Sequence, residues 1–290
     1  MIPQLIVSGM AVGILYGLVA LGIVLVFKST NILNFAHGEL AMVSTFVAYS
    51  LLTSLQLPYL LAVIITLLFA GLVGYGIERV IMRPLIGFPP MIPTIATLGL
   101  FLMSGIVVMW IWHSDYPLAF PPIIPDTTIN IKGIVFSSLS ILILVITSVL
   151  MVTLYLFFRF SKLGVAMRAV SDDIDAARLM GISIYQIFSL AWILANMLAA
   201  LAGILLAPII FLDTSMMITI ILKAFVAAIL GGFSSMPGAV IGGILLGIME
   251  NLIGAFISSQ FKNAFPFLVI IFVLMFMPQG IFGGWRGKTA

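Results

Sequence analysis

The sequence predicts an all-α protein, a polytopic transmembrane helical bundle of about eight to ten spans. Hydrophobic residues make up 63% of the 290-residue chain and charged residues only 7%, and the mean hydropathy is +1.34. Soluble domains average about 25% charged residues, so this composition indicates a chain that is almost wholly embedded in a membrane. Apolar runs long enough to cross the hydrocarbon core, which takes ~20 residues, recur along the whole sequence.

Most of the chain divides into apolar runs that are predicted to span the membrane. They cover residues 5–27, 40–57, 59–77, 91–112, 134–158, 184–206, 239–257 and 264–277. The stretch 207–233 is also apolar but interrupted. A re-entrant piece at 28–40 or within 207–222 would change both the number of spans and the side of the N-terminus.

Lysine and arginine predict the orientation, because cytoplasmic loops carry an excess of them. The segment 78–90, which is predicted to be a short basic loop, holds two of these residues, and the segment 159–183 and the C-terminal tail hold four and two. The segments 113–133 and 258–263 hold one each. We therefore expect the first three segments, the C-terminus included, to be cytoplasmic and the proline-rich loop 113–133 to face outward.

Several kinds of chemistry find no support in the residues. No loop approaches the ~100 residues of a typical domain, so residues 1–290 are expected to form a single transmembrane domain. With no cysteine and only His37 and His113 as histidines, neither a metal site nor a nucleophile–base set is expected. The tail would match a phosphate-binding loop only with glycine at 282, where Phe282 stands. We expect no cofactor and no enzymatic activity.

The segment 159–183, here called the charged island, holds a large share of the chain's charge. Seven charged residues fall within it, although long apolar runs lie on both sides. Charges inside lipid cost several kcal/mol each, so the island must stand in water. Its charged residues are Arg159, Lys162, Arg168, Asp172, Asp173, Asp175 and Arg178.

A short capped helix is predicted inside the charged island, at residues 173–180. Ser171 and Asp172 are good N-cap residues, and further aspartates in the first turn suit the positive end of the helix dipole. Gly181 is placed to end the helix. Ile174, Ala177 and Arg178 share one face, and the alanines at 176 and 177 would let a partner surface approach closely. The alternative is an ordinary capped loop helix without a partner.

A second polar segment, residues 28–40, follows the first apolar run. It contains Asn31, Asn34, His37 and Glu39 within a short distance. One interpretation is a broken or re-entrant element that lines a pathway, since irregular polar backbone is tolerated at membrane depth only beside protein or water. The other is a short interfacial loop whose Lys28 and Glu39 are solvated.

Charged residues also stand inside apolar runs. Glu250, followed by Asn251, lies in the run 239–257, and Lys223 lies in the interrupted stretch. An ionisable residue inside the membrane is either functional or a polar lock between helices, and a lysine can also extend its amine to the interface. Pro237-Gly238 is predicted to break the helix, and together with segment 28–40 it allows an inverted repeat with broken elements.

Three stretches resemble a known family. Asp175-Ala176-Ala177-x-x-x-Gly181 is similar to the E-A-A-x-x-x-G signature of permease subunits of bacterial ABC importers. ALGIVLVFKSTNILNFAHGELAMV and AAILGGFSSMPGAVIGGILLGIMEN resemble the Liv-type, LivH-like branched-chain amino acid permeases. The resemblance covers nearly the whole chain. Asp175 replaces the usual glutamate, and Ala191-Trp192-Ile193-Leu194 stands where I-x-L-P is usual, so the chain resembles a divergent branch.

The resemblance implies a permease subunit that moves leucine, isoleucine or valine across the bacterial inner membrane by alternating access. It implies a paralogous permease, two cytoplasmic ATPase subunits that hydrolyse ATP, and an external substrate-binding protein as partners. The residues implied in coupling to the ATPases are Asp172, Asp173, Asp175, Ala176, Ala177, Arg178 and Gly181. The candidates for the translocation pathway are Asn31, Asn34, His37, Glu39, Glu250 and Asn251.

Two other functions remain compatible with the sequence. The first is an ABC permease for urea, amides or other amino acids, since substrate choice rests largely with the binding protein. The second is an ion-coupled secondary carrier in which Glu250 and Lys223 relay charge, although this leaves the charged island without a role.

Overall fold

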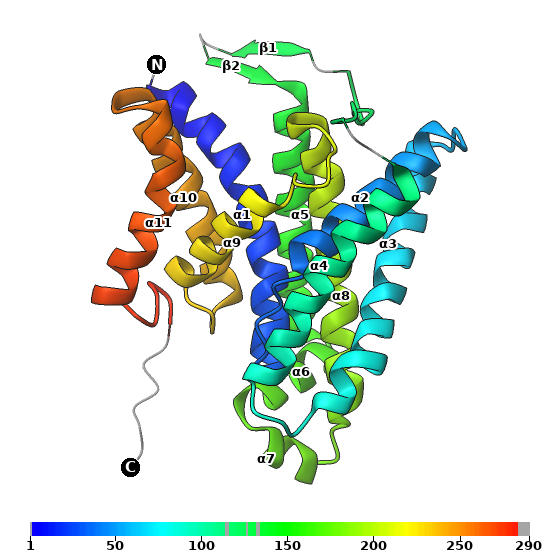
Figure 1. Cartoon of the computed structure of the whole chain (residues 1–290). Coiled ribbons are helices and arrows are strands. Elements are labelled where there is room, and N and C mark those ends of the chain that lie inside the picture. Colours follow the sequence, from blue (N-terminus) through cyan, green and yellow to red (C-terminus); the bar gives the residue numbers. More distant parts are fainter. Residues whose placement is uncertain (1, 114–115, 126, 132–133, 284–290) are drawn as a thin grey trace. The chain divides into compact units, whose positions relative to one another are not determined.

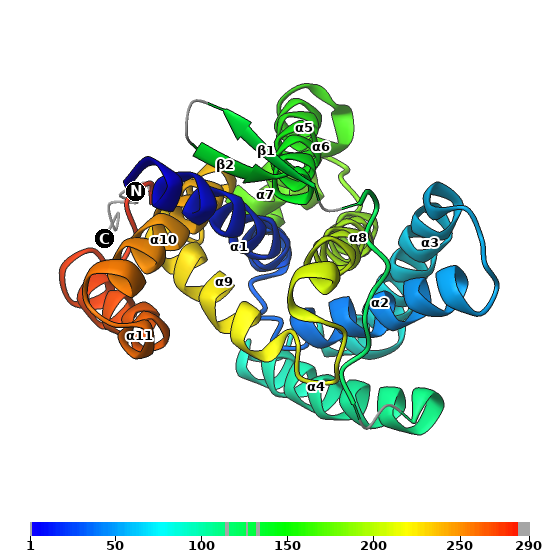
Figure 2. The same cartoon turned by 90° about the horizontal axis from the view of Figure 1, so that it is seen from above.

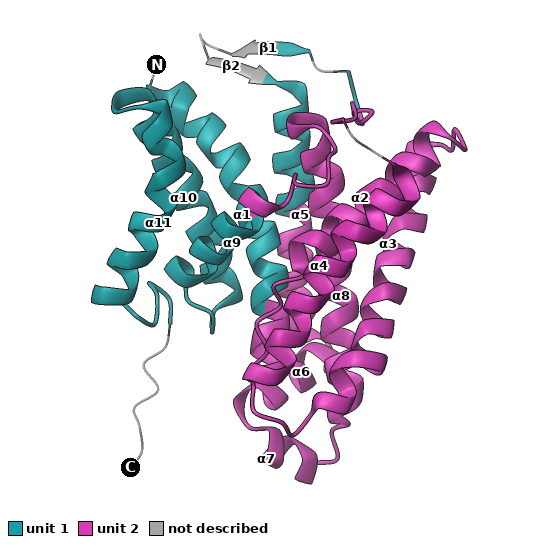
Figure 3. Ribbon diagram, in the orientation of Figure 1, with its two compact units in different colours: residues 1–24, 124–148, 221–290 teal, residues 25–123, 149–220 magenta. Residues whose placement is uncertain are grey.

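A computed structural model describes the chain apart from residues 1, 114–115, 126, 132–133 and 284–290 (Figure 1). The described residues divide into two compact units (Figure 3). Unit 1 comprises residues 1–24, 124–148 and 221–290, and unit 2 comprises residues 25–123 and 149–220. Lys132, Arg286 and Lys288, which contributed to the predicted orientation, lie outside the described residues.

Seven of the described helices are long and apolar enough to cross a membrane, which confirms a polytopic helical bundle. They are α1 (Ile2–Thr30), α3 (Tyr59–Ile77, continued to Leu85), α4 (Met91–Trp112), α5 (Ser138–Phe160), α8 (Ile184–Ile210), α10 (Met236–Phe256) and α11 (Ser259–Phe276). The predicted eight to ten spans included two segments that fold as shorter helices. These are α2 (His37–Thr53), with 17 residues, and α9 (Ile218–Gly231), with 14.

Helix α8 forms the centre of unit 2. Helices α2 and α3 both pack on it, and α4 packs on α2 (Figure 2). Close contact with α3 depends on Gly74, because a Cβ there would lie 2.6 Å from the carbonyl oxygen of Trp192. Trp192 and the alanines near it on α8, Ala191, Ala195 and Ala199, are fully buried. Small residues on α3 and α8 therefore let α2, α3 and α8 pack closely together.

The segment after α3 corrects one prediction. Residues 78–90 were predicted as a short basic loop, but the helix continues through a π-helical turn, η1 (Glu78–Met82), and a 3₁₀ turn, η2 (Arg83–Leu85). The loop prediction is wrong because the cluster of charged residues at 78–83 does not end the helix. Glu78 is in fact 1% exposed, and its charge is neutralised within the protein.

The charged island contains two helices instead of one. Helix α6 (Lys162–Asp172) precedes α7 (Ile174–Leu179), and Ser161 caps α6 by accepting a hydrogen bond from the Gly164 backbone N–H at 2.9 Å. Gly164 lies against the backbone of Phe157 and Phe158 at the end of α5, where a side chain would not fit. This sharp corner between α5 and α6 was not predicted.

Unit 1 contains the first part of α1 with α9, α10 and α11, and a hairpin of β1 (Thr128–Ile131) and β2 (Ile134–Ser137). The hairpin shortens the predicted span 134–158, which begins as α5 only at Ser138. Helices α1 and α10 touch through their backbones. A Cβ at Gly13 would lie 2.6 Å from the Gly243 carbonyl oxygen, and one at Gly9 2.7 Å from Ile248 Cα. Glycines at these positions thus allow the two helices to pack backbone against backbone.

The break before α10 lies earlier than predicted. Helix α9 ends at Gly231, and Gly232 has a φ of +98°, which glycine adopts without steric cost. Pro237 and Gly238 instead lie in the first turn of α10, where Ser235 caps the helix by accepting from the Gly238 N–H at 3.0 Å. Proline is tolerated there because a first-turn N–H has no helical partner to lose.

Candidate coupling, pathway and anchoring sites

Helix α7 begins at an aspartate cap. The Oδ1 of Asp173 accepts hydrogen bonds from the backbone N–H of Asp175 at 2.9 Å and of Ala176 at 3.0 Å. Ser171 and Asp172, which were predicted as the caps, instead lie in the last turn of α6. The prediction was one residue early because three cap-forming residues stand together, and only the extended backbone of Asp173, at φ −155° and ψ 112°, fits an N-cap.

Helix α7 ends at Leu179, and Gly181 makes the turn that stops it, as predicted. Gly181 has a φ of +80°, and its N–H donates to the Arg178 carbonyl at 3.0 Å. The N–H of Ile182 donates to the Ala177 carbonyl at 3.1 Å. This pair of bonds is the Schellman arrangement, in which the residue after the cap must adopt the left-handed conformation. Helix α8 then begins at Ile184, so α7 and α8 are joined by a tight turn.

The exposed face of α7 differs from the predicted one. Ala177 is 3% exposed and packs inward, so it cannot present a surface to a partner. Asp175, Ala176 and Arg178 are exposed. Leu179 is 89% exposed and Met180 82%. An apolar tip this bare, at the end of a charged and capped helix, has the chemistry of a protein contact site.

Within the polar segment 28–40, residues 31–36 form a short break between α1 and α2. Asn31 is exposed, with a φ of 56°, whereas Asn34 is fully buried and its Oδ1 accepts from the Ala36 N–H at 3.1 Å. Thr97 of α4 accepts from the Phe35 N–H at 3.2 Å and so fixes the break. Irregular backbone is thus surrounded by protein here, as buried irregular backbone requires.

Glu39 contradicts the interpretation in which its side chain is solvated in an interfacial loop. It is 3% exposed in the first turn of α2, and His37 beside it is fully buried. Within the described part of the chain, Glu39 makes neither a hydrogen bond nor an ion pair, and the Nδ2 of Asn34 has no partner. A buried carboxyl and a buried amide therefore keep hydrogen-bonding capacity in the same segment.

Glu250 belongs to a buried ionic cluster in unit 1. Its Oε1 lies 2.6 Å from Nζ of Lys223, and its Oε2 accepts from the Tyr16 hydroxyl at 3.1 Å. Nζ of Lys223 also donates to that hydroxyl at 3.1 Å. Lys223 is only 8% exposed, so its amine does not extend to the interface. The cluster joins α1, α9 and α10 as a polar lock.

Asn251 follows Glu250 but takes part in a separate contact. Its Nδ2 donates to Ser8 Oγ at 2.9 Å, and its Oδ1 accepts from Lys262 Nζ at 2.9 Å. Neighbouring helix positions point about 100° apart, which is why the two side chains reach different partners. The sequence had grouped them because they are adjacent.

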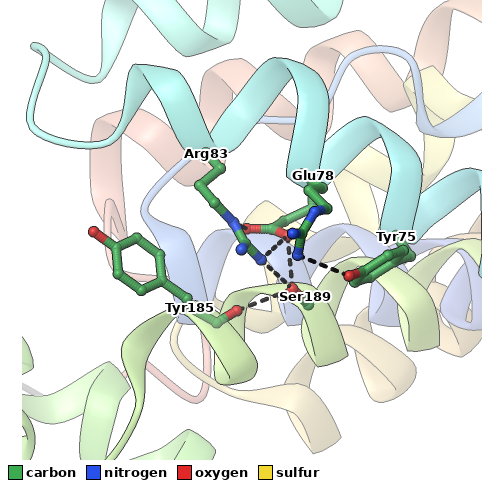
Figure 4. Close-up of polar contacts among 6 residues, drawn as sticks. Tyr75, Glu78, Arg83, Tyr185 and Ser189 are labelled. Atoms are coloured by element: carbon green, nitrogen blue, oxygen red, sulfur yellow. Dashed lines mark hydrogen bonds and ion pairs between the residues drawn. The ribbon is translucent and has the colours of Figure 1, made fainter.

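The sequence analysis missed one cluster, in unit 2. Arg83 binds Glu78 through Nε to Oε1 at 3.1 Å and Nη2 to Oε2 at 2.7 Å, and Ser189 of α8 joins them (Figure 4). Glu78 and Arg83 stand five residues apart, which does not place side chains together on an ordinary α-helix. The π-helical turn η1 removes this mismatch, and no propensity signal marks such a turn.

The seven long apolar helices identify a multi-pass membrane protein. The chain belongs to the branched-chain amino acid transport system permease component family, whose model matches residues 5–274. It is 34% identical to the high-affinity branched-chain amino acid transport system permease protein BraD of Pseudomonas aeruginosa, over 97% of this chain and 95% of that protein.

Other relatives are also named as branched-chain amino acid permeases and match over most of their length. LivH of Salmonella typhimurium is 32% identical over 97% of this chain and 95% of its own. A probable LivH of Methanocaldococcus jannaschii is 31% identical over 93% of this chain and 89% of its own. The solved structure of PsaBC from Streptococcus pneumoniae shares the fold, with a TM-score of 0.50 at 14% identity, covering 96% of this chain and 92% of that one.

Proposed function

We propose that this chain moves leucine, isoleucine or valine across a bacterial inner membrane as the permease subunit of an ABC importer, with its C-terminus in the cytoplasm. Membership of the permease family supports this most strongly. ATP is hydrolysed by two partner subunits, a paralogous permease completes the pathway, and an external binding protein delivers the substrate. Residues 1–290 act as one permease domain.

The coupling element of this proposal is α7 with its two caps. A helix of six residues is too short to be stable alone, so the Asp173 cap and the Gly181 turn keep it in shape. The Leu179–Met180 tip is exposed and would contact an ATPase, together with the exposed residues Asp172, Asp175, Ala176 and Arg178. Ala177 contributes by packing inward, which holds α7 on the rest of unit 2.

The pathway proposal concentrates on Asn34 and Glu39. Branched-chain amino acids are zwitterions with apolar side chains, so a pathway for them needs few charges and some unused polar atoms. Asn34 and Glu39 have polar atoms that are not hydrogen-bonded, while the polar atoms of Glu250 and Asn251 bind neighbouring side chains. Asn31 and His37 remain candidates because they border the same break.

The decisive experiment is uptake of radiolabelled leucine by proteoliposomes that contain the complex purified from native membranes. Uptake should require internal ATP and persist when ion gradients are collapsed. Glu39→Gln should raise the substrate concentration needed for half-maximal uptake, whereas Asn251→Ser should not. Uptake that follows an ion gradient and ignores ATP would overturn the proposal in favour of a secondary carrier.

The geometry of Glu250 and Lys223 does not support a role in relaying charge. The two charges neutralise each other at 2.6 Å, and both side chains are buried. A relay group needs access to the protons or ions it carries, which a closed pair lacks.

A further inference from the structure

The cluster of Glu78, Arg83 and Ser189 connects two helices of unit 2 (Figure 4). Ser189 Oγ donates to Glu78 Oε2 at 2.6 Å, and Arg83 Nη2 donates to Ser189 Oγ at 2.8 Å. Together with the two-point pairing of Arg83 and Glu78, each of the three side chains bonds both others. Bonds that involve charged groups are roughly twice as strong as neutral ones, and the paired guanidinium fixes orientation as well as distance.

Burial makes this cluster more than a surface ion pair. Glu78 is 1% exposed and Ser189 7%, while the Arg83 side chain is 26% exposed. An exposed ion pair contributes little to stability, but a buried carboxylate whose partner is removed is strongly unfavourable. Because Ser189 of α8 hydrogen-bonds both charged side chains, separating α8 from the end of α3 would remove a partner from the buried Glu78 carboxylate.

The cluster contacts α8 immediately after the proposed coupling helix. Helix α7 ends at Leu179 and α8 begins at Ile184, so Ser189 lies in the second turn of α8. The Tyr185 ring, in the first turn, lies 5.3 Å from the Arg83 guanidinium carbon. Arg83 thus contacts both of the turns that directly follow α7.

The other end of the cluster belongs to α3. Glu78 and Arg83 stand in η1 and η2, which continue α3 without a loop. One turn before Glu78, Gly74 brings the α3 backbone against Trp192 and Asn196 of α8. Close backbone packing and the hydrogen bonds of Ser189 to Glu78 and Arg83 together leave little freedom for α8 to slide along α3.

We propose that Glu78 and Arg83 are positioning residues that transmit displacement of α7 to α3, so that movement caused by the ATPases reaches the transmembrane helices. This inference rests on the proposed function of the chain. Helix α7 is six residues long and ends in a tight turn, so a push on its exposed tip moves the start of α8. The cluster passes that movement to α3. Without it, ATP hydrolysis continues but drives less transport.

The test measures leucine molecules transported per ATP hydrolysed by the whole complex in proteoliposomes. Arg83→Gln, Arg83→Lys and Ser189→Ala are compared with the control Arg79→Gln, because Arg79 is exposed and bonds Tyr75 on its own helix. Arg83→Lys keeps the charge but loses the two-point geometry. Coupling free energies correspond to factors of about five or more, so Arg83→Gln should lower the transport-to-hydrolysis ratio roughly fivefold. The control should keep the wild-type ratio.

Each outcome has a distinct meaning. A ratio that falls in Arg83→Gln, falls less in Arg83→Lys and Ser189→Ala, and holds in Arg79→Gln supports the inference. Hydrolysis and transport that fall in parallel, with the ratio unchanged, would reduce the cluster to a structural role and overturn it. If the complex with Arg83→Gln does not assemble, the transport-to-hydrolysis ratio of Ser189→Ala decides between these two outcomes. A wild-type complex without ATP-driven uptake would instead overturn the proposed function itself.

Discussion

Replacing Lys223 by methionine should strongly destabilise unit 1, because it leaves Glu250 buried without its cation. The pair is separated by 2.6 Å, and Glu250 is 1% exposed. Removing one partner of a buried ion pair typically costs ~3–5 kcal/mol, since the remaining charge loses compensation but stays out of water. Methionine keeps the length and the apolar stem of lysine, so packing changes little.

The measurement is equilibrium unfolding of the purified protein in mixed micelles. Lys223→Met should lose about 3–5 kcal/mol, and Lys162→Met, at an exposed lysine of α6, should change stability by no more than about 0.5 kcal/mol. The double variant Lys223→Met, Glu250→Gln should recover most of the loss, because the amide is neutral and still accepts from the Tyr16 hydroxyl. A loss below about 1 kcal/mol in the single variant, or no recovery in the double, would refute the lock.

Three further predictions concern caps and close packing. Gly181→Val should leave the protein in the membrane but abolish leucine uptake, because a φ of +80° costs a side chain roughly 1–2 kcal/mol; normal uptake would contradict a coupling role for α7. Asp173→Ala should cost ~1 kcal/mol and speed hydrogen exchange at the Asp175 amide, while Asp173→Asn preserves protection; equal exchange in both would argue against the cap. Gly13→Leu should lower the yield of folded protein by blocking the approach of α10, whereas Gly105→Ala, where nothing lies within 4 Å of the added Cβ, should not; equal yields would show that α1 and α10 need no close contact.

Much of the fold follows directly from local pattern. Helix α4 has the predicted bounds, because an uncharged run between prolines and a tryptophan-rich end has one reasonable solution in a bilayer. The stop at Gly181 is also local, since a glycine after a short amphipathic helix supplies the left-handed conformation at no steric cost. The predicted position of a helix cap was wrong where several residues of similar capping propensity stand together, as at residues 171–173.

The sequence by itself determined that this chain is an embedded helical protein and that its charged island carries a short capped helix, because burial of charge in lipid and helix capping are local costs. Only the tertiary structure decided which charges are solvated. The sequence left open whether four charged residues are exposed or functional, yet all four are buried: Glu39, Glu78, Lys223 and Glu250. Their states depend on side chains up to 234 positions away, such as Tyr16 beside Glu250, and no window along the chain contains that information.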